Sequence, residues 1–276
     1  MNEILNHYKN LQLKDIAEAY SCTCQLITIK DDNPKSHGTG IFIEVDAEKF
    51  LVTAAHVIDN KTDNLFIPVG EHNLLSPGGD VTFTALTQNR EKDKIDIAIF
   101  KLYPETVSKI PPIYKFLSQS QLGVSHEFLN LPMYSAVGFP TSKSKIKYKE
   151  DKFITKPFFY TTMPTDAKFY AQLNRDFHSN IIVNYDKNRV FNHTNSTISN
   201  GPDTYGMSGC GLWFSDPKEI VSGNNSKQLV AVMTDWPKEN RKCWIGTRID
   251  VITEVLRIKY GLNLPKSNIL KVSNLS

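Results

Sequence analysis

Short apolar runs alternate with polar turns along most of this chain. The runs are rich in Val, Ile, Phe and Thr, and clusters of Gly, Pro, Asn and Asp separate them. Runs of this kind predict β-strands. We expect strands at residues 22–30, 39–45, 50–53, 65–69, 80–86, 96–102, 133–139, 153–160, 181–185, 211–215, 229–234 and 243–249.

Two segments have helical spacing instead. Apolar residues between Ile4 and Tyr20 recur every three or four positions, which predicts an amphipathic helix lying against the protein. Its polar face is poor in Lys and Arg, which argues against a membrane-surface role. Residues 250–260 have the same period and end at Gly261, a common helix stop.

Many short strands followed by a late helix predict two packed β-barrels, an all-β fold with flanking helices. Pro111, Pro112 and the polar residues up to Ser125 predict a crossover between the two halves. The expected organisation is an N-terminal helix (1–20), a first barrel (21–125), a second barrel (126–249) and a C-terminal helix with a tail (250–276).

Composition supports a globular protein without a nucleic-acid or membrane partner. A chain of 276 residues with 40% hydrophobic content is long enough for one large domain or two barrels. The net charge of +3 is small, and we interpret the basic run at residues 143–149 as a solvated loop. The first twenty residues hold several charges and no long apolar run, so we expect no secretory signal, and no apolar run is long enough to predict a membrane span.

The four cysteines favour a reducing compartment. Cys22 and Cys24 are too close for an easy bridge, and one Cys-x-Cys lacks a metal partner set. Free thiols are the simpler interpretation, and they predict a cytoplasmic location. The abundance of Asn, Lys and Ile is typical of an AT-rich bacterial genome.

Three motifs each hold one residue type used in acyl transfer. They are Thr-Ala-Ala-His ending at His56, Asp-Ile-Ala-Ile-Phe-Lys-Leu beginning at Asp96, and Gly-Met-Ser-Gly around Ser208. A serine hydroxyl is a weak nucleophile unless a histidine takes its proton and a carboxylate orients that histidine. The order His, Asp, Ser distinguishes the chymotrypsin-like arrangement from those of subtilisin and the α/β-hydrolases.

Each of the three also has a structural interpretation. A histidine at a strand end is often a core residue, an aspartate can cap a strand, and serine between glycines is ordinary turn chemistry. The complete motif and the downstream partners favour the catalytic interpretation for His56. The apolar run after Asp96 predicts a buried carboxylate, which needs a partner such as an imidazole N–H. An α/β-hydrolase elbow would require glycine where Cys210 stands.

With these motifs the chain resembles the trypsin-like serine peptidases. It resembles the intracellular and HtrA-like bacterial members, without a PDZ domain, more than the secreted digestive enzymes. Thr-Ala-Ala-His-Val matches the family's T-A-A-H-C or T-N-x-H-V motif, and the Asp96 motif matches D-I-A-L-L-K-L. Residues 38–43 match the G-S/T-G-x-x-I strand, and the resemblance runs from about residue 22 to residue 260. It implies two six-stranded antiparallel β-barrels with the active site between them.

The resemblance assigns further roles and marks departures. In the family the amides of the serine and of the residue two before it form the oxyanion hole, here Ser208 and Gly206. Secreted members have Asp where Met207 stands, so we expect no activation by N-terminal cleavage. Val57 replaces the cysteine of the family disulfide. We interpret Cys210, which replaces the usual glycine, as a small buried residue.

Substrate preference is the less specific part of the resemblance. The family's pocket walls place Asp203, Thr234, Asp235 and Trp236 as candidate substrate-binding residues. Asp203 would attract a Lys or Arg side chain, or serve as a turn residue after Gly-Pro. Trp236 would narrow the pocket or pack the barrel.

We therefore predict a cytoplasmic serine endopeptidase that makes limited cuts in a protein partner, with a second protein as a candidate activator. The resemblance suggests a bacterial defence context, including antiviral defence, or a stress pathway. The mechanism requires no cofactor and no metal. Two alternatives remain open: a binding or scaffold protein on a protease fold, and an esterase-like hydrolase of small acyl substrates.

Overall fold

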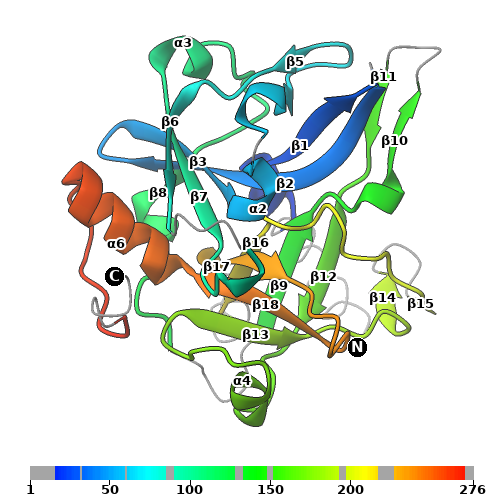
Figure 1. The fold of residues 1–276 in the computed structure, drawn as a ribbon, viewed down its shortest axis with the longest axis vertical. Coiled ribbons are helices and arrows are strands. Elements are labelled where there is room, and N and C mark those ends of the chain that lie inside the picture. Colours follow the sequence, from blue (N-terminus) through cyan, green and yellow to red (C-terminus); the bar gives the residue numbers. More distant parts are fainter. Residues whose placement is uncertain are drawn as a thin grey trace, which may run out of the picture.

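The computed structural model describes residues 16–31, 33–59, 61–84, 90–127, 133–147, 152–192, 197–216 and 227–270. These residues are mostly β, in two six-stranded sheets that follow one another along the chain (Figure 1). The prediction of an all-β class with flanking helices is confirmed. The curled antiparallel sheets are compatible with a chymotrypsin-like β fold.

The first sheet places two ends of neighbouring strands side by side. Its strands, in spatial order, are β1 (Thr23–Lys30), β2 (Asn33–Val45), β3 (Glu48–Ala54), β7 (Ile97–Leu102) and β6 (Gly79–Phe83), with β8 (Leu117–Ser118) on β2. All pairings are antiparallel except the short parallel pair of β8 with β2. In the register of β3 and β7, Ala54 lies opposite Ile97. Residues just after β3 and just before β7 therefore meet at one edge of the sheet.

The second sheet curls until its outer strands approach each other. Its strands, in spatial order, are β12 (Phe158–Thr162), β9 (Met133–Gly138), β16 (Gly211–Ser215), β17 (Lys227–Asp235), β18 (Cys243–Arg248) and β13 (Asn180–Asn184). An antiparallel bridge between Pro164 and Val183 joins the segment after β12 to β13. A sheet closed in this way leaves few unpaired strand edges.

A hydrophobic core joins the two sheets and the last helix. Helix α6 (Ile249–Tyr260) is buried through Ile252 and Leu256, which share a cluster with Phe50 of the first sheet and Trp213 of the second. The helix ends at Gly261 with a φ of 68°, the left-handed residue that the sequence predicted as its stop. Figure 1 shows α6 beside both sheets.

The remaining elements are short. They are α2 (Ala55–Ile58), η1 (Thr62–Asn64), β4 (Ile67–Pro68), β5 (Leu74–Leu75), η2 (Arg90–Lys92), α3 (Pro104–Val107), η3 (Gln119–Gln121), η4 (Thr141–Lys143), β10 (Ser144–Lys147), β11 (Lys152–Thr155), α4 (Lys168–Gln172), β14 (Val190–Asn192) and β15 (Thr197–Ser199).

Two local expectations changed, and a third is tested only in part. The single strand predicted at 153–160 is two strands, because β11 pairs with β10 while β12 pairs with β9, and Pro157, which has no N–H to donate, lies between them. The basic run at 143–149, predicted as a loop, includes the strand β10. Residues 16–21 are helical, whereas the rest of the predicted N-terminal helix lies outside the described residues.

Candidate active site

Asp96 directly precedes β7, at the end of the sheet where β3 finishes and β7 begins. Its side chain is 11% exposed, and its φ of 51° is uncommon for a residue other than glycine. The backbone oxygen of Asp96 accepts a bond from Ala55 N at 2.9 Å, and its Oδ1 accepts one from His56 N at 2.9 Å. Strained backbone of this kind persists where its surroundings hold it, often at functional sites.

The second carboxylate oxygen of Asp96 contacts His56. Oδ2 lies 2.6 Å from His56 Nδ1, and the His56 side chain is 39% exposed. One ring nitrogen is thus held by the carboxylate, which leaves Nε2 as the nitrogen available to another group. The sequence-predicted pair of His56 and Asp96 is brought together by the fold.

The electrostatics of the pair favour a basic imidazole. Burial by itself lowers the pKa of His56, but the hydrogen bond and the charge of Asp96, together with the charges of Asp235 and Asp59, outweigh burial, and the net shift raises that pKa above its ordinary value. Burial also raises the pKa of the Asp96 carboxyl, and the bonds to His56 offset only part of this effect. His56 is therefore a stronger base than a free imidazole.

Ser208 stands in a tight turn between two glycines with positive φ. Gly206 has a φ of 87° and Gly209 a φ of 89°, conformations that glycine adopts without steric cost. The turn is braced by bonds from Met207 N to Thr204 O and from Cys210 N to Met207 O, each 2.9 Å long.

The Ser208 turn is hydrogen-bonded to β2, which in turn is bonded to β3, the strand that leads to His56. Thr39 N donates to Ser208 O at 2.9 Å, and Thr53 Oγ1 donates to Thr39 O at 2.7 Å. Gly209 packs so closely on this part of the first sheet that a Cβ there would collide with Thr39 O and Thr53 Oγ1. Because Thr53 is three residues before His56, the fold brings the predicted nucleophile loop against the base of the histidine loop.

The two amides predicted to form the oxyanion hole have no acceptor among the described residues. Within the part of the chain that the structure describes, the N–H groups of Gly206 and Ser208 donate to no other group, whereas those of Met207, Gly209 and Cys210 all donate to backbone oxygens. Unused backbone donors are what an oxyanion hole requires.

The candidate substrate-binding residues have partners within the protein. Asp203 is paired with Lys187 at 2.6 Å, so a cation already faces the carboxylate that was predicted to attract one. Asp235 is paired with Arg175 at 2.8 Å. Each of the two carboxylates therefore already has a basic side chain of this protein as its partner.

The remaining two candidates differ in exposure. Thr234 is buried, and among the described residues its hydroxyl has no hydrogen-bond partner. Trp236 is half-buried, donates from Nε1 to Arg241 O at 3.1 Å, and lies under the Arg241 guanidinium at 4.1 Å. The exposed ring of Tyr205 packs edge-on against Trp236 at 6.2 Å between centroids.

Some residues of this site were not predicted from sequence. Thr39 and Thr53 belong to two of the sequence motifs, but those motifs predict strands at these positions and not contacts with the serine turn. Thr141 holds Tyr205 O from a distant part of the chain, with the N···O distance at 2.7 Å. Arg175 stands in a polar stretch with no motif, so no sequence signal was available for it.

The cysteines and other candidate centres are easily placed. All four cysteines are buried free thiols, and burial raises the pKa of the Cys210 thiol, as expected for a packing residue and not a nucleophile. Among the described residues no group of His, Cys, Asp and Glu is arranged to hold a metal ion. No helix in the described ranges is long and apolar enough to cross a membrane.

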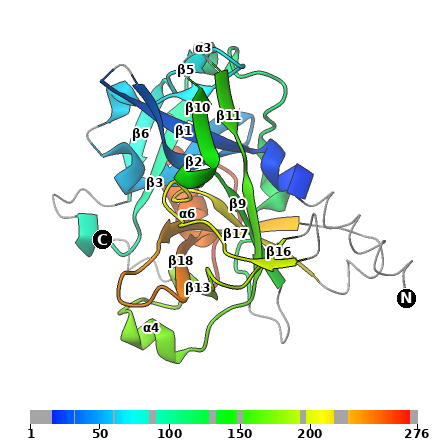
Figure 2. The same cartoon turned by 90° about the vertical axis from the view of Figure 1, so that its right-hand side faces the viewer.

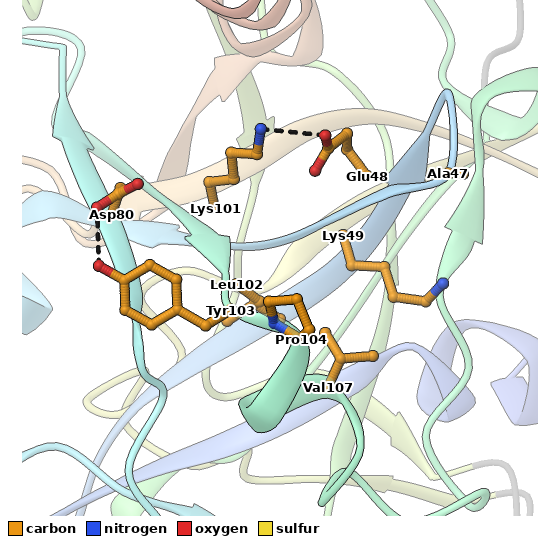
Figure 3. Close-up of a pocket in the computed structure, with 9 residues that line it drawn as sticks. All are labelled: Ala47, Glu48, Lys49, Asp80, Lys101, Leu102, Tyr103, Pro104 and Val107. Carbon is orange, nitrogen blue, oxygen red and sulfur yellow. Dashed lines mark hydrogen bonds and ion pairs between the residues drawn. The ribbon is translucent and has the colours of Figure 1, made fainter.

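A groove in the described surface lies away from this site. The groove, of about 290 Å³, is lined by Lys101, Tyr103 and their neighbours, at the opposite end of β7 from Asp96 (Figure 3). Its charged groups are paired, with Lys101 3.1 Å from Glu48 and the Tyr103 hydroxyl 2.8 Å from Asp80. The groove therefore does not belong to the site of His56.

No family model and no curated protein sequence matches this chain. Solved structures do match, among them one from work described as showing that aromatic interactions drive the coupled folding and binding of the intrinsically disordered Sesbania mosaic virus VPg protein. That match has a TM-score of 0.45 and 16% identity, and it covers 87% of this chain and 90% of the other. Similarity at this level establishes neither a family nor a function for the chain.

Proposed function

We propose that this protein is a trypsin-like serine endopeptidase with His56, Asp96 and Ser208 as its catalytic residues. The observation that carries the proposal is the double hold of Asp96 on His56, through the backbone N–H and through Nδ1. A carboxylate in this position fixes the tautomer and the direction of the imidazole, as a serine hydrolase requires.

In the proposed reaction, the oxygen of Ser208 attacks the carbonyl carbon of a peptide bond while His56 Nε2 takes the hydroxyl proton. The carbon–nitrogen bond then breaks, and the same proton passes to the leaving amine. A water molecule repeats the sequence on the acyl-enzyme, which releases the acid and restores the serine. The unused amides of Gly206 and Ser208 support the step in which the carbonyl oxygen becomes negatively charged.

The setting we propose is intracellular, with limited cleavage of a protein partner and not general digestion. Four buried free thiols support a reducing compartment such as the cytoplasm. Met207 is fully buried where a carboxylate would be needed to receive a new N-terminus, which supports control by some other means, such as an activating protein. A bacterial defence or stress role is a proposal that rests on the sequence resemblance alone.

The test is labelling with a fluorophosphonate probe, which forms a bond from the serine oxygen to phosphorus and releases fluoride. We expect the full chain to be labelled and Ser208→Ala to be unlabelled, with a fall of the order of 10⁶ in turnover when a substrate is found. The matched control is Ser199→Ala, which changes an exposed serine of β15 and should label normally. Absence of Ser208-dependent labelling between pH 6 and 9 would support a binding or scaffold protein on this fold.

A further inference from the structure

The peptide units around Gly206 are held from behind by two threonine side chains from separate elements. A trans peptide has its C=O and N–H on opposite sides, so a bond that fixes the oxygen also sets the direction of the N–H. Of the two predicted oxyanion donors, Gly206 N–H belongs to the peptide unit of Tyr205, and Ser208 N–H belongs to that of Met207.

Thr141 holds the first of these peptide units. Tyr205 O accepts one bond from Thr141 N at 2.7 Å and a second from Thr141 Oγ1 at 3.1 Å. Gly206 N–H must then point away from Thr141, into the space where it has no acceptor among the described residues. A flip of this unit would break both bonds.

Thr39 holds the next unit along the chain. Its Oγ1 donates to Gly206 O at 2.8 Å and accepts from Phe139 N at 3.1 Å, and Thr39 itself is fully buried. The other end of this unit is fixed as well, because Met207 N donates to Thr204 O at 2.9 Å. Gly206 thus has both of its neighbouring peptide units held, with a φ that only glycine adopts freely.

The third unit is closed within the turn. Met207 O accepts from Cys210 N at 2.9 Å, which turns Ser208 N–H to the opposite side. This bond is the turn's own and needs no outside partner. The outside supports are therefore Thr39 and Thr141 alone among the described residues that bond to the oxygens of Tyr205 and Gly206.

We infer that Thr39 and Thr141 are positioning residues that keep the oxyanion hole formed in the uncleaved chain. The inference rests on the proposed function and adds its control. Met207 is apolar and fully buried, so its side chain cannot form an ion pair that would hold the oxyanion hole in place. Hydroxyl-to-carbonyl hydrogen bonds from Thr39 of β2 and Thr141 of η4 take that role. η4 directly precedes the hairpin of β10 and β11, which Figure 2 shows alongside β1 and β2. Gln25 Nε2 of β1 donates to Ser144 Oγ of β10 at 2.9 Å.

The test compares the rate of fluorophosphonate labelling in Thr141→Val and Thr141→Ser. Valine keeps the backbone bond to Tyr205 O but removes the hydroxyl bond, so we expect labelling to slow about 3- to 10-fold, the effect of one neutral hydrogen bond. Serine keeps the hydroxyl and should restore the rate. Thr141 is exposed, so the thermal midpoint and the pH midpoint of labelling should stay those of the unmodified chain.

The second pair is Thr39→Val and Thr39→Ser. Valine at this buried position removes a donor and an acceptor together, so we expect a larger loss of rate, together with a lower thermal midpoint, and rescue by serine. If both valine variants show Ser208-dependent labelling as fast as that of the unmodified chain, the inference is overturned and the proposed function stands. If the unmodified chain is not labelled at all, the proposed function fails, and the inference fails with it.

Discussion

Replacing Asp96 by asparagine tests the central contact of the proposed site. Asparagine is the best substitute sterically, because it tolerates the φ of 51° found at Asp96 better than alanine would. Its side-chain oxygen can still accept the bond from His56 N. The change therefore replaces one interaction, the 2.6 Å contact between the carboxylate and His56 Nδ1.

That replacement moves the proton of the neutral imidazole from one ring nitrogen to the other. An amide N–H facing Nδ1 requires Nδ1 to be the acceptor, so the ring proton moves to Nε2, which then cannot take a proton from Ser208. We expect the rate of fluorophosphonate labelling to fall about 10⁴-fold, as the same change does in the Ser-His-Asp triad of chymotrypsin-like proteases. A 10⁴-fold fall corresponds to about 5.4 kcal/mol, whereas one charge-assisted bond is worth about 1.5–3 kcal/mol, so loss of the bond alone would account for only about a quarter to a half of the effect.

Stability should not follow activity in this variant. Burial raises the pKa of Asp96, so its contribution to stability is full below its ordinary pKa of about 3.8 and is lost as the pH rises through the raised value. Because burial penalises the charged carboxylate by more than its bonds to His56 offset, a neutral asparagine should leave the thermal midpoint at pH 8 unchanged or slightly higher.

The assay is labelling rate against time at pH 8, with the thermal midpoint measured on the same samples. The matched control is Asp93→Asn, which changes another buried carboxylate three residues away, one bonded to Arg90 at 2.7 Å and not to His56. We expect this control to lower the thermal midpoint and to label normally. A fall of less than tenfold in Asp96→Asn, or an equal fall in Asp93→Asn, would refute the assignment of Asp96.

Two further predictions follow from the same contacts. Labelling should increase with pH through an apparent pKa above the ~6.5 of free imidazole, because His56 must be neutral to accept a proton and Asp96 raises its pKa; a rate profile from pH 5 to 9 checks this, and a midpoint below 6 would contradict it. Gly209→Ala should lower the free energy of unfolding by more than about 1 kcal/mol and abolish labelling, because its φ is 89° and a Cβ would meet Thr39 O. Urea denaturation measures the first effect, and Gly261→Ala is a control with a φ of 68° but open space around it.

Most of the strand pattern could be predicted from the sequence because alternation of apolar and polar residues is a local property. The expected strand at 211–215 coincides with β16, and the helix expected at 250–260 is α6 to within one residue. The error at 153–160 arose because apolar content continues across Pro157 while the pairing partner changes from β10 to β9. A partner change is a tertiary event, and only the proline marked it locally.

The candidate triad could also be predicted from the sequence, because each of its residues is marked by a motif of neighbouring residues along the chain. The partners of the substrate-binding candidates were not. Asp203 meets Lys187 from the loop after β13, and Asp235 meets Arg175 from the segment after α4. Charge pairing depends on which loops the fold brings within a few ångströms, and no spacing along the chain encodes that.

By itself, the sequence determined the strand-rich class, the closing helix and the three residues on which the proposed chemistry depends. The tertiary structure alone decided that Thr39 and Thr141 hold the peptide units around Gly206, and that the amides of Gly206 and Ser208 are left without acceptors among the described residues. The physical reason is that a side chain's identity limits which bonds it can make, while the direction of a backbone N–H depends on what holds the oxygen of the same peptide unit from across the fold.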